Sequence, residues 1–277
     1  MKIINACADI DSFFPDGKFT LATWRTYADS FSAELASKCI DDIADYDFEQ
    51  DVLPVVQTAL DNREKRRAVS HTFAAVTRKL SDRIRLLYDS EPELDIVLYL
   101  GLCNAAGWAT TLDGNRAVLL GFEKLIELNW CDENALIGLL YHEIGHIWHA
   151  DMGGKCPEMP KQSHAALWQL YSEGVAMLCE QLLCGEENYF HQDKDGWLAW
   201  CQENEGSIKR EYLRRMEQGE SVQDFFGDWA RYEGHPDVGY YLGVRFVRGL
   251  YEKYGLKQTA VLPFAQLEQE FLQYANA

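Results

Sequence analysis

The sequence predicts an α+β fold that is mostly α. Three observations lead to this class. Apolar residues recur at helical spacing through the first 90 residues, short apolar runs typical of strands lie between residues 94 and 121, and helical periodicity returns after residue 132. Because the strands are few and lie together, we expect one small sheet between two helical regions.

The N-terminal region is predicted to form two long helices. The first covers about residues 18–48, and the second begins near Pro54, a residue tolerated in a first turn, and runs to about Tyr88. Basic side chains gather on the exposed face of the second helix, which we interpret as a solvated surface: Arg63, Lys65, Arg66, Arg67, Arg78, Lys79, Arg83 and Arg85.

Three strands are expected after the break at Ser90-Glu91-Pro92. They cover Leu94–Leu100, Trp108–Thr111 and Arg116–Gly121, and the Asp113-Gly114 pair supplies the turn between the last two. A sheet of three or more strands should therefore immediately precede the next helix.

Helices account for the remainder of the chain. Asp132 can cap a helix from about Glu133 to Ala150, which Gly153 and Gly154 end, and Ser163 can cap another from about His164 to Cys184. Further helices are expected over about residues 194–218, 237–254 and 263–275. We predict that residues 1–92 form a helical region packed on the unit formed by residues 93–277.

Charge and composition exclude several classes of partner. The 44 acidic and 26 basic residues give a net charge of −18, which repels phosphate backbones and anionic lipid surfaces. We therefore expect neither nucleic acid nor membrane as a partner. The first residues lack the apolar run of a signal peptide, and the eight cysteines lie far apart, which favours reduced thiols and a cytoplasmic protein. An effector exported without such a signal would have the same pattern.

A pair of helix-borne histidines is the most informative feature. In His142-Glu143-Ile144-Gly145-His146 the histidines lie four residues apart, on one face of the helix and about 6 Å from each other. Two imidazoles so placed can share one tetrahedral Zn²⁺ ion, and Glu143 can reach a water bound to it. Zinc lowers the pKa of that water to about 7, and the carboxylate accepts its proton as the water attacks a carbonyl. The pattern predicts one zinc ion per chain.

Two core histidines hydrogen-bonded to their neighbours would be the plain alternative. The apolar stripe of the helix disfavours it, because that stripe follows Leu136, Leu140, Ile144 and Ile147 and does not include the histidines.

Glu173 is the best candidate for the third ligand. It lies in the middle of a predicted helix among leucines, where a carboxylate is costly unless it is paired or bound to a metal. Gly174 and Ala176 beside it are small enough for another helix to approach. A salt-bridged or exposed glutamate remains the alternative interpretation, and Asp151, Glu158 and His164 are weaker ligand candidates.

A metzincin pattern does not fit. It needs a glycine where His149 stands and a histidine where Met152 stands. His149 lies about 10.5 Å along the helix from His142, too far to share one ion with both other histidines. It can support a ligand, face a substrate, or be a partly exposed residue at the helix end.

These residues resemble the gluzincin clan of metallopeptidases, in which two helix-borne histidines and a glutamate from a later helix hold zinc. The resemblance implies a zincin-like fold, His142, His146 and Glu173 as ligands, and Glu143 as general base. The chain is closer still to an uncharacterised domain family regarded as zinc-dependent proteases. The similarity covers roughly residues 95–255 and includes Ala117–Gly121, Glu173–Ala176 and Gly239–Gly243.

The resemblance implies two further roles. The strand before the motif helix lies at a sheet edge in such enzymes, so Ala117, Val118, Leu119 and Leu120 are expected to bind a peptide by strand addition. A downstream Tyr or His donates a hydrogen bond to the oxyanion, and Tyr240 is our candidate for it, followed by Tyr241 and His235. One departure is Met177, which stands where the thermolysin-like pattern has a supporting aspartate.

The sequence therefore predicts a zinc-dependent peptidase that acts on a peptide or protein, with residues 93–277 as its catalytic domain. Two other functions fit the same residues. One is the hydrolysis of a non-peptide amide or ester. The other is a binding module with little catalysis, which only the missing supporting aspartate at Met177 suggests.

Overall fold

The computed structural model describes all residues except 89–91, 155–160 and 228. The chain divides into two compact units, residues 1–143 and 144–277. The division falls inside a continuous helix, α8 (Glu133–Asp151), so this helix contributes to both units. The predicted division after residue 92 remains a prediction. None of the helices that the structure describes is long and apolar enough to cross a membrane.

The first unit holds one sheet and a set of helices. The strands are β1 (Lys2–Asn5), β2 (Asp95–Tyr99), β3 (Gly107–Leu112) and β4 (Asn115–Gly121). The helices before α8 are α1 (Ile10–Phe13), α2 (Leu21–Phe31), α3 (Leu35–Asp42), the π-helix η1 (Phe48–Val52), α4 (Leu53–Asp61), α5 (Arg63–Thr77), α6 (Leu80–Tyr88) and α7 (Phe122–Glu127). The α+β, mostly helical class is confirmed.

The prediction of two long N-terminal helices is wrong, because each predicted span is divided into shorter helices. Ser32 has extended backbone angles and ends α2, and its hydroxyl accepts the N–H of Glu34 and Leu35. Asn62 separates α4 from α5, and its side chain accepts the N–H of Lys65 at 3.0 Å. Both side chains bond to nearby backbone in a way that starts a new segment, and this competes with helix continuation.

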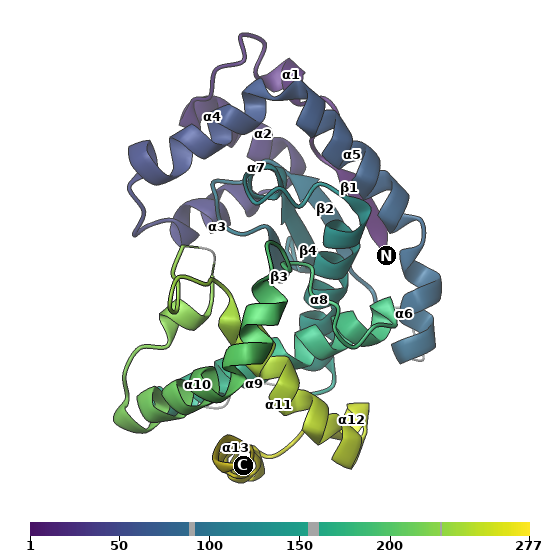
Figure 1. The fold of residues 1–277 in the computed structure, drawn as a ribbon. Coiled ribbons are helices and arrows are strands. Elements are labelled where there is room, and N and C mark those ends of the chain that lie inside the picture. The colour runs from purple at the N-terminus through teal and green to yellow at the C-terminus, as the bar shows by residue number, and fades with distance from the viewer. Residues whose placement is uncertain (89–91, 155–160, 228) are drawn as a thin grey trace. The chain divides into compact units, whose positions relative to one another are not determined.

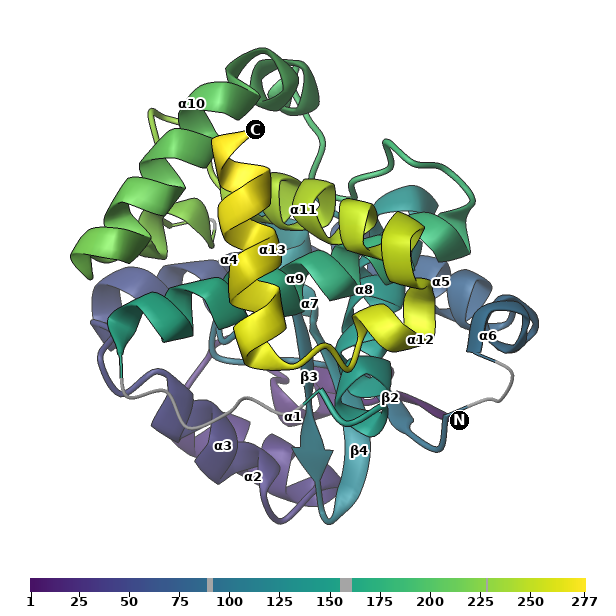
Figure 2. The ribbon, with the colours of Figure 1, turned by 90° about the horizontal axis from the view of Figure 1, so that it is seen from below.

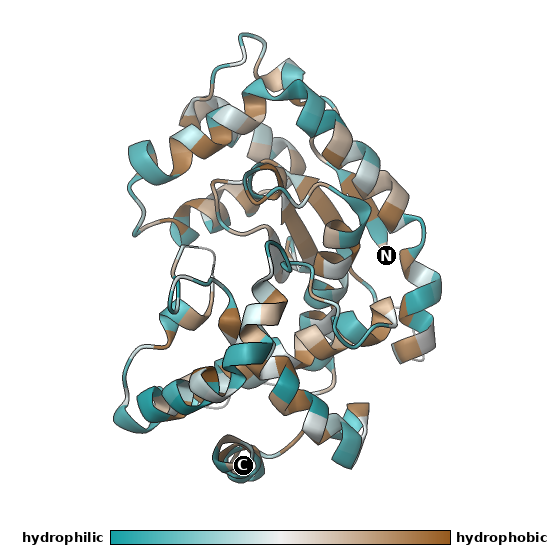
Figure 3. Cartoon of the chain, viewed as in Figure 1, coloured by the Kyte–Doolittle hydropathy of each residue, from teal (hydrophilic) through white to brown (hydrophobic). Residues whose placement is uncertain are grey.

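The sheet has the order β1-β2-β4-β3 (Figure 1). Strands β1, β2 and β4 are parallel, and β3 runs antiparallel to β4 as a hairpin. The three strands predicted from the sequence are confirmed, and β1 was not predicted because its apolar run is short. Apolar residues line β2 and β4 (Figure 3), as expected for strands buried on both faces.

The predicted edge strand is not at an edge. Ala117 to Leu120 pair with β2 on one side and with β3 on the other, and all four side chains are fully buried. Their backbone groups are therefore already used in the sheet, and strand addition at residues 117–120 is excluded. The strand at that edge of the sheet is β3.

A buried carboxylate lies at the carboxyl ends of the parallel strands. Glu123 follows β4, is fully buried, and accepts N–H groups of the segment after β2. Burial raises the pKa of its carboxyl from 4.5 to about 7, and the backbone donors offset part of this effect. Near neutral pH the group therefore exchanges between its ionised and neutral forms.

The second unit is helical. After the last turns of α8 it contains α9 (Gln162–Cys184), α10 (Trp197–Gln218), the 3₁₀ helix η2 (Gln223–Phe225), α11 (Val238–Tyr254), α12 (Leu256–Thr259) and α13 (Phe264–Asn276) (Figure 2). The C-terminal helices predicted from the sequence are confirmed to within a few residues. The cap predicted at Ser163 is wrong, because α9 begins at Gln162 after Lys161.

Helices α9 and α11 meet through glycine. A Cβ placed on Gly174 would lie 2.4 Å from the backbone oxygen of Gly243, so neither backbone has room for a side chain there. The close helix approach expected from Gly174 is confirmed.

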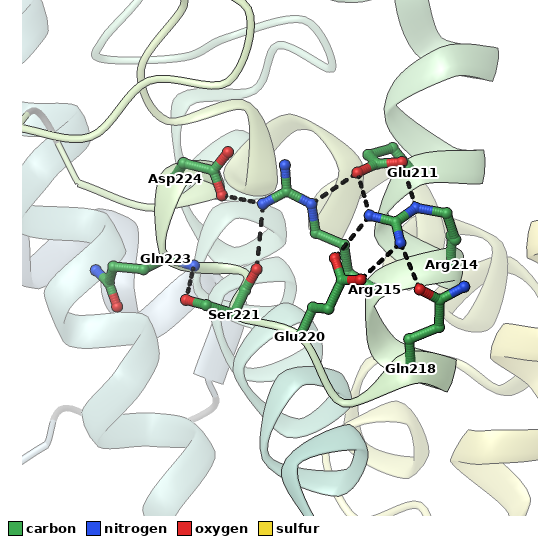
Figure 4. A network of polar contacts seen from close by, with 8 residues as sticks. All are labelled: Glu211, Arg214, Arg215, Gln218, Glu220, Ser221, Gln223 and Asp224. Carbon is green, nitrogen blue, oxygen red and sulfur yellow. Dashed lines mark hydrogen bonds and ion pairs between the residues drawn. The ribbon is translucent and has the colours of Figure 1, made fainter.

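A network of ion pairs links the end of α10 to the segment that follows it. Arg214 pairs with Glu211 and Glu220, and Arg215 pairs with Glu211 and Asp224 (Figure 4).

We predict that Gly174→Ala lowers the free energy of unfolding by about 1–3 kcal/mol, because the clashing atoms belong to a helix backbone and cannot move aside. The matched control is Gly249→Ala on α11, where a Cβ would meet no heavy atom within 4 Å. This control should be unchanged or stabilised, since Ala is the better helix former. Urea unfolding of both variants measures the difference, and equal effects would contradict the packing described.

We also predict a pH-dependent stability difference between the wild type and Glu123→Gln. The folded-state pKa of Glu123 is raised, so its contribution is fully present below pH ~4.5 and is lost as the pH rises through about 7. The loss amounts to ~3 kcal/mol at most. Relative to the wild type, the variant should therefore become more stable between pH 5 and 8 in urea unfolding, whereas a constant difference would contradict the raised pKa.

Candidate metal centre

Helix α8 positions both histidines of the motif. Its first turn is capped as predicted, because the Asp132 carboxylate accepts the N–H of Ala135 at 3.0 Å. The stripe Leu136, Leu140 and Ile144 is fully buried and fixes the rotation of the helix about its axis. His142 and His146 then lie one turn apart on a different face.

The third member comes from α9. Glu173 Oε2 lies 3.2 Å from His146 Nε2. One ligand atom from each of His142, His146 and Glu173 falls within 4.8 Å of the others, and this group can hold a metal ion. His142 is buried, while the side chains of His146 and Glu173 keep 21% of their surface exposed. The three residues selected from the sequence are thus brought together.

The spacing of His146 and Glu173 matches that of two ligands on one metal ion. Ligand bonds of about 2.0–2.1 Å in a tetrahedral arrangement place neighbouring ligand atoms about 3.3 Å apart. The His146–Glu173 distance of 3.2 Å already agrees with that spacing. Two imidazole nitrogens and one carboxylate oxygen leave a fourth position for water or substrate, which is the donor set of hydrolytic zinc sites.

Gly145 explains why α9 comes near enough to contribute. A Cβ at Gly145 would lie 2.9 Å from Cys179 Cβ and 3.1 Å from Ala176 Cα. The two helices therefore touch through a residue without a side chain, next to His146. Gly145 was not singled out within the His-Glu-x-x-His motif, although a glycine inside a helix is itself a sign of close packing.

Glu143 lies beside the edge strand. It is 7% exposed, and a Cβ built on Gly107, the first residue of β3, would lie 2.6 Å from Glu143 Oε1. The candidate base thus occupies space that the missing side chain of Gly107 leaves open. Gly107 was not predicted from the sequence, in which the Ala105-Ala106-Gly107 run was the only available signal.

His149 belongs to a buried aromatic cluster. Its ring stacks on Trp168 with centroids 5.8 Å apart and meets the edge of Tyr171 at 5.2 Å. With 2% of its surface exposed, it is not the exposed helix-end residue considered above. Burial lowers the pKa of His149 to about 4, so the ring is neutral at physiological pH.

The weaker ligand candidates lie outside the group. His164 Nε2 is 3.9 Å from Glu268 Oε1 and its ring packs near Phe264, while Asp151 is exposed at the end of α8. Glu158 falls outside the described residues.

The candidate oxyanion donors differ in how they are held. Tyr241 donates its hydroxyl proton to Glu205 at 2.6 Å, and His235 stacks on Trp200 with centroids 3.8 Å apart. The ring of Tyr240 is half-buried against Phe226 at 5.6 Å. Tyr240 is the candidate preferred from the sequence, and its role stays a prediction.

Comparison with known proteins gives no match to a family profile, a curated sequence or a solved structure.

We predict that the purified protein binds about one zinc ion per chain, and that His142→Ala and Glu173→Ala each lose it, since two ligands rarely hold the ion. Zinc should raise the melting temperature of the wild type but not of these variants. Elemental analysis and thermal unfolding provide the measurement, with His164→Ala as the control that keeps the metal. Equal zinc content in wild type and Glu173→Ala would contradict the assignment of the third ligand.

Proposed function

We propose that this protein is a zinc-dependent peptidase. The observation that carries the proposal is the convergence of His142, His146 and Glu173 within 4.8 Å, with Glu143 on the same helix beside a sheet edge. A metal-binding group alone would suit many roles. A carboxylate next to it, outside the ligand set and 7% exposed, adds the proton acceptor that hydrolysis requires.

The proposed mechanism assigns each residue a separate task. His142, His146 and Glu173 would hold the zinc ion, which when bound would supply Lewis acidity that lowers the pKa of water to about 7 and polarises a carbonyl group. The Glu143 carboxylate accepts the proton of the attacking water and passes it to the departing amine. Tyr240 is the proposed hydrogen-bond donor to the oxygen on which negative charge develops.

The edge strand β3 is the proposed place for the substrate backbone. Among the residues that the structure describes, only β4 pairs with it, on one side, and all its residues keep partial or full exposure. An extended peptide can add to such an edge through main-chain hydrogen bonds, which read no particular side chain. Because β3 begins at Gly107, a peptide placed along it passes close to Glu143. This role replaces the one expected for residues 117–120.

The test is Glu143→Gln, which keeps the shape of the side chain and removes the proton acceptor. We expect unchanged zinc content and a loss of peptide cleavage of about 10²-fold or more, in line with general base catalysis. The activity is measured on a mixed peptide library with mass-spectrometric detection. A matched control is Glu127→Gln, an exposed glutamate on α7.

Full activity of Glu143→Gln would overturn the mechanism. A wild-type protein that holds zinc but cleaves no peptide would instead favour hydrolysis of a non-peptide amide or ester at the same site.

A further inference from the structure

The metal centre does not use Glu123, although it is a fully buried carboxylate of the first unit. The side chain leaves the first turn of α7 directly after β4. Its Oε2 accepts the N–H of Gly101 at 2.9 Å, and its Oε1 accepts the N–H of Cys103 at 3.2 Å. Both oxygens are thus bound to the segment that connects β2 to β3.

Glycines let this segment lie directly on the carboxylate. A Cβ on Gly101 would be 2.5 Å from Glu123 Oε1, and one on Gly121 would be 3.0 Å from the same atom. Cys103 holds a positive φ of 63°, a conformation that costs free energy for a residue with a side chain. The hydrogen bond from Cys103 to Glu123 offsets that cost and keeps the segment in this shape.

The same segment ends beside Glu143. Gly121 donates its N–H to the oxygen of Ala106 at 3.1 Å, so the entry to β3 is tied to β4. The next residue, Gly107, leaves no room for a Cβ, which would lie 2.6 Å from Glu143 Oε1 and 2.8 Å from Glu143 Cγ. The φ of Gly107 lies outside the left-handed region, so its backbone angles do not require glycine, and only the space does.

We propose that Glu123 is a positioning residue for Glu143, and that it acts through residues 101–107 and the missing side chain of Gly107. The proposal rests on the proposed function in so far as Glu143 is the general base. Its physical basis is that a reacting group displaced by about 1 Å can lose as much as 10² in rate. A carboxylate suits this role because it accepts both N–H groups, whereas the amide of a glutamine turns a donor toward one of them.

Two variants test the proposal, and each has a matched control. Glu123→Gln is compared with Glu127→Gln, whose carboxylate pairs with Lys124 at the surface of the same helix. Gly107→Ala is compared with Gly249→Ala, where the added methyl meets no heavy atom within 4 Å. Zinc content, kcat and KM are measured with a peptide that the wild type cleaves, and amide hydrogen exchange is followed over residues 101–107.

Glu123→Gln and Gly107→Ala should keep zinc, lose kcat by about tenfold or more, and change KM by less than about threefold, since the reacting group moves while the substrate strand stays in place. Glu123→Gln should also speed the exchange of the Gly101 and Cys103 amides, and the two controls should match the wild type. Faster exchange with an unchanged kcat in Glu123→Gln would overturn the proposal. If Glu123→Gln does not fold, Gly107→Ala alone decides, and an unchanged kcat overturns the proposal.

Failure of the proposed function has a different result. If the wild type cleaves no peptide, crystal structures of the wild type and Gly107→Ala still test the contact. Displacement of the Glu143 carboxylate would support the positioning device, and an unmoved carboxylate would overturn it.

Discussion

The close approach of α8 and α9 at Gly145 is the constraint on which the metal centre depends. Any side chain at this position would meet Cys179 Cβ and Ala176 Cα within about 3 Å, which a packed interior does not tolerate. Because the helices touch there, Glu173 reaches His146 at 3.2 Å, and three donors from two helices converge. The glycine inside the motif is therefore as much a part of the site as the ligands beside it.

Glycine has the same function at one further place in each unit. Gly174 lets α11 press against α9, and Gly107 lets the edge strand lie against Glu143. At Gly174 the backbone of Gly243 fills the volume that a side chain would need, and at Gly107 the side chain of Glu143 fills it. Charged groups then hold the segments between the helices and strands, as Glu123 does inside the first unit and the arginine pair does at the end of α10.

Patterns local in the sequence predicted the helices and strands that contain the site. They could not predict which strands pair with one another in the sheet. The cap at Asp132 and the apolar stripe of α8 are local patterns, so they predicted this helix correctly. The polar residue Glu173 among leucines is a local pattern too, and it selected the residue that lies beside His146 in a group able to hold a metal ion. β4 lies inside the sheet because it pairs with β2 on one side and with β3 on the other. The continuous apolar run of residues 117–120 is typical of a strand buried on both faces, and the edge position was expected from the family resemblance. The contacts of Glu123 and Gly107 likewise depend on three-dimensional neighbours, so a single sequence could not have revealed them.

The metal centre proposed above requires that His142, His146 and Glu173 hold one metal ion. Anomalous X-ray scattering at the zinc absorption edge, from crystals grown with zinc, tests it most directly. We predict a single strong peak at about 2.0–2.1 Å from His142, His146 and Glu173 ligand atoms. A peak bound elsewhere, or none in zinc-saturated crystals, would contradict the account.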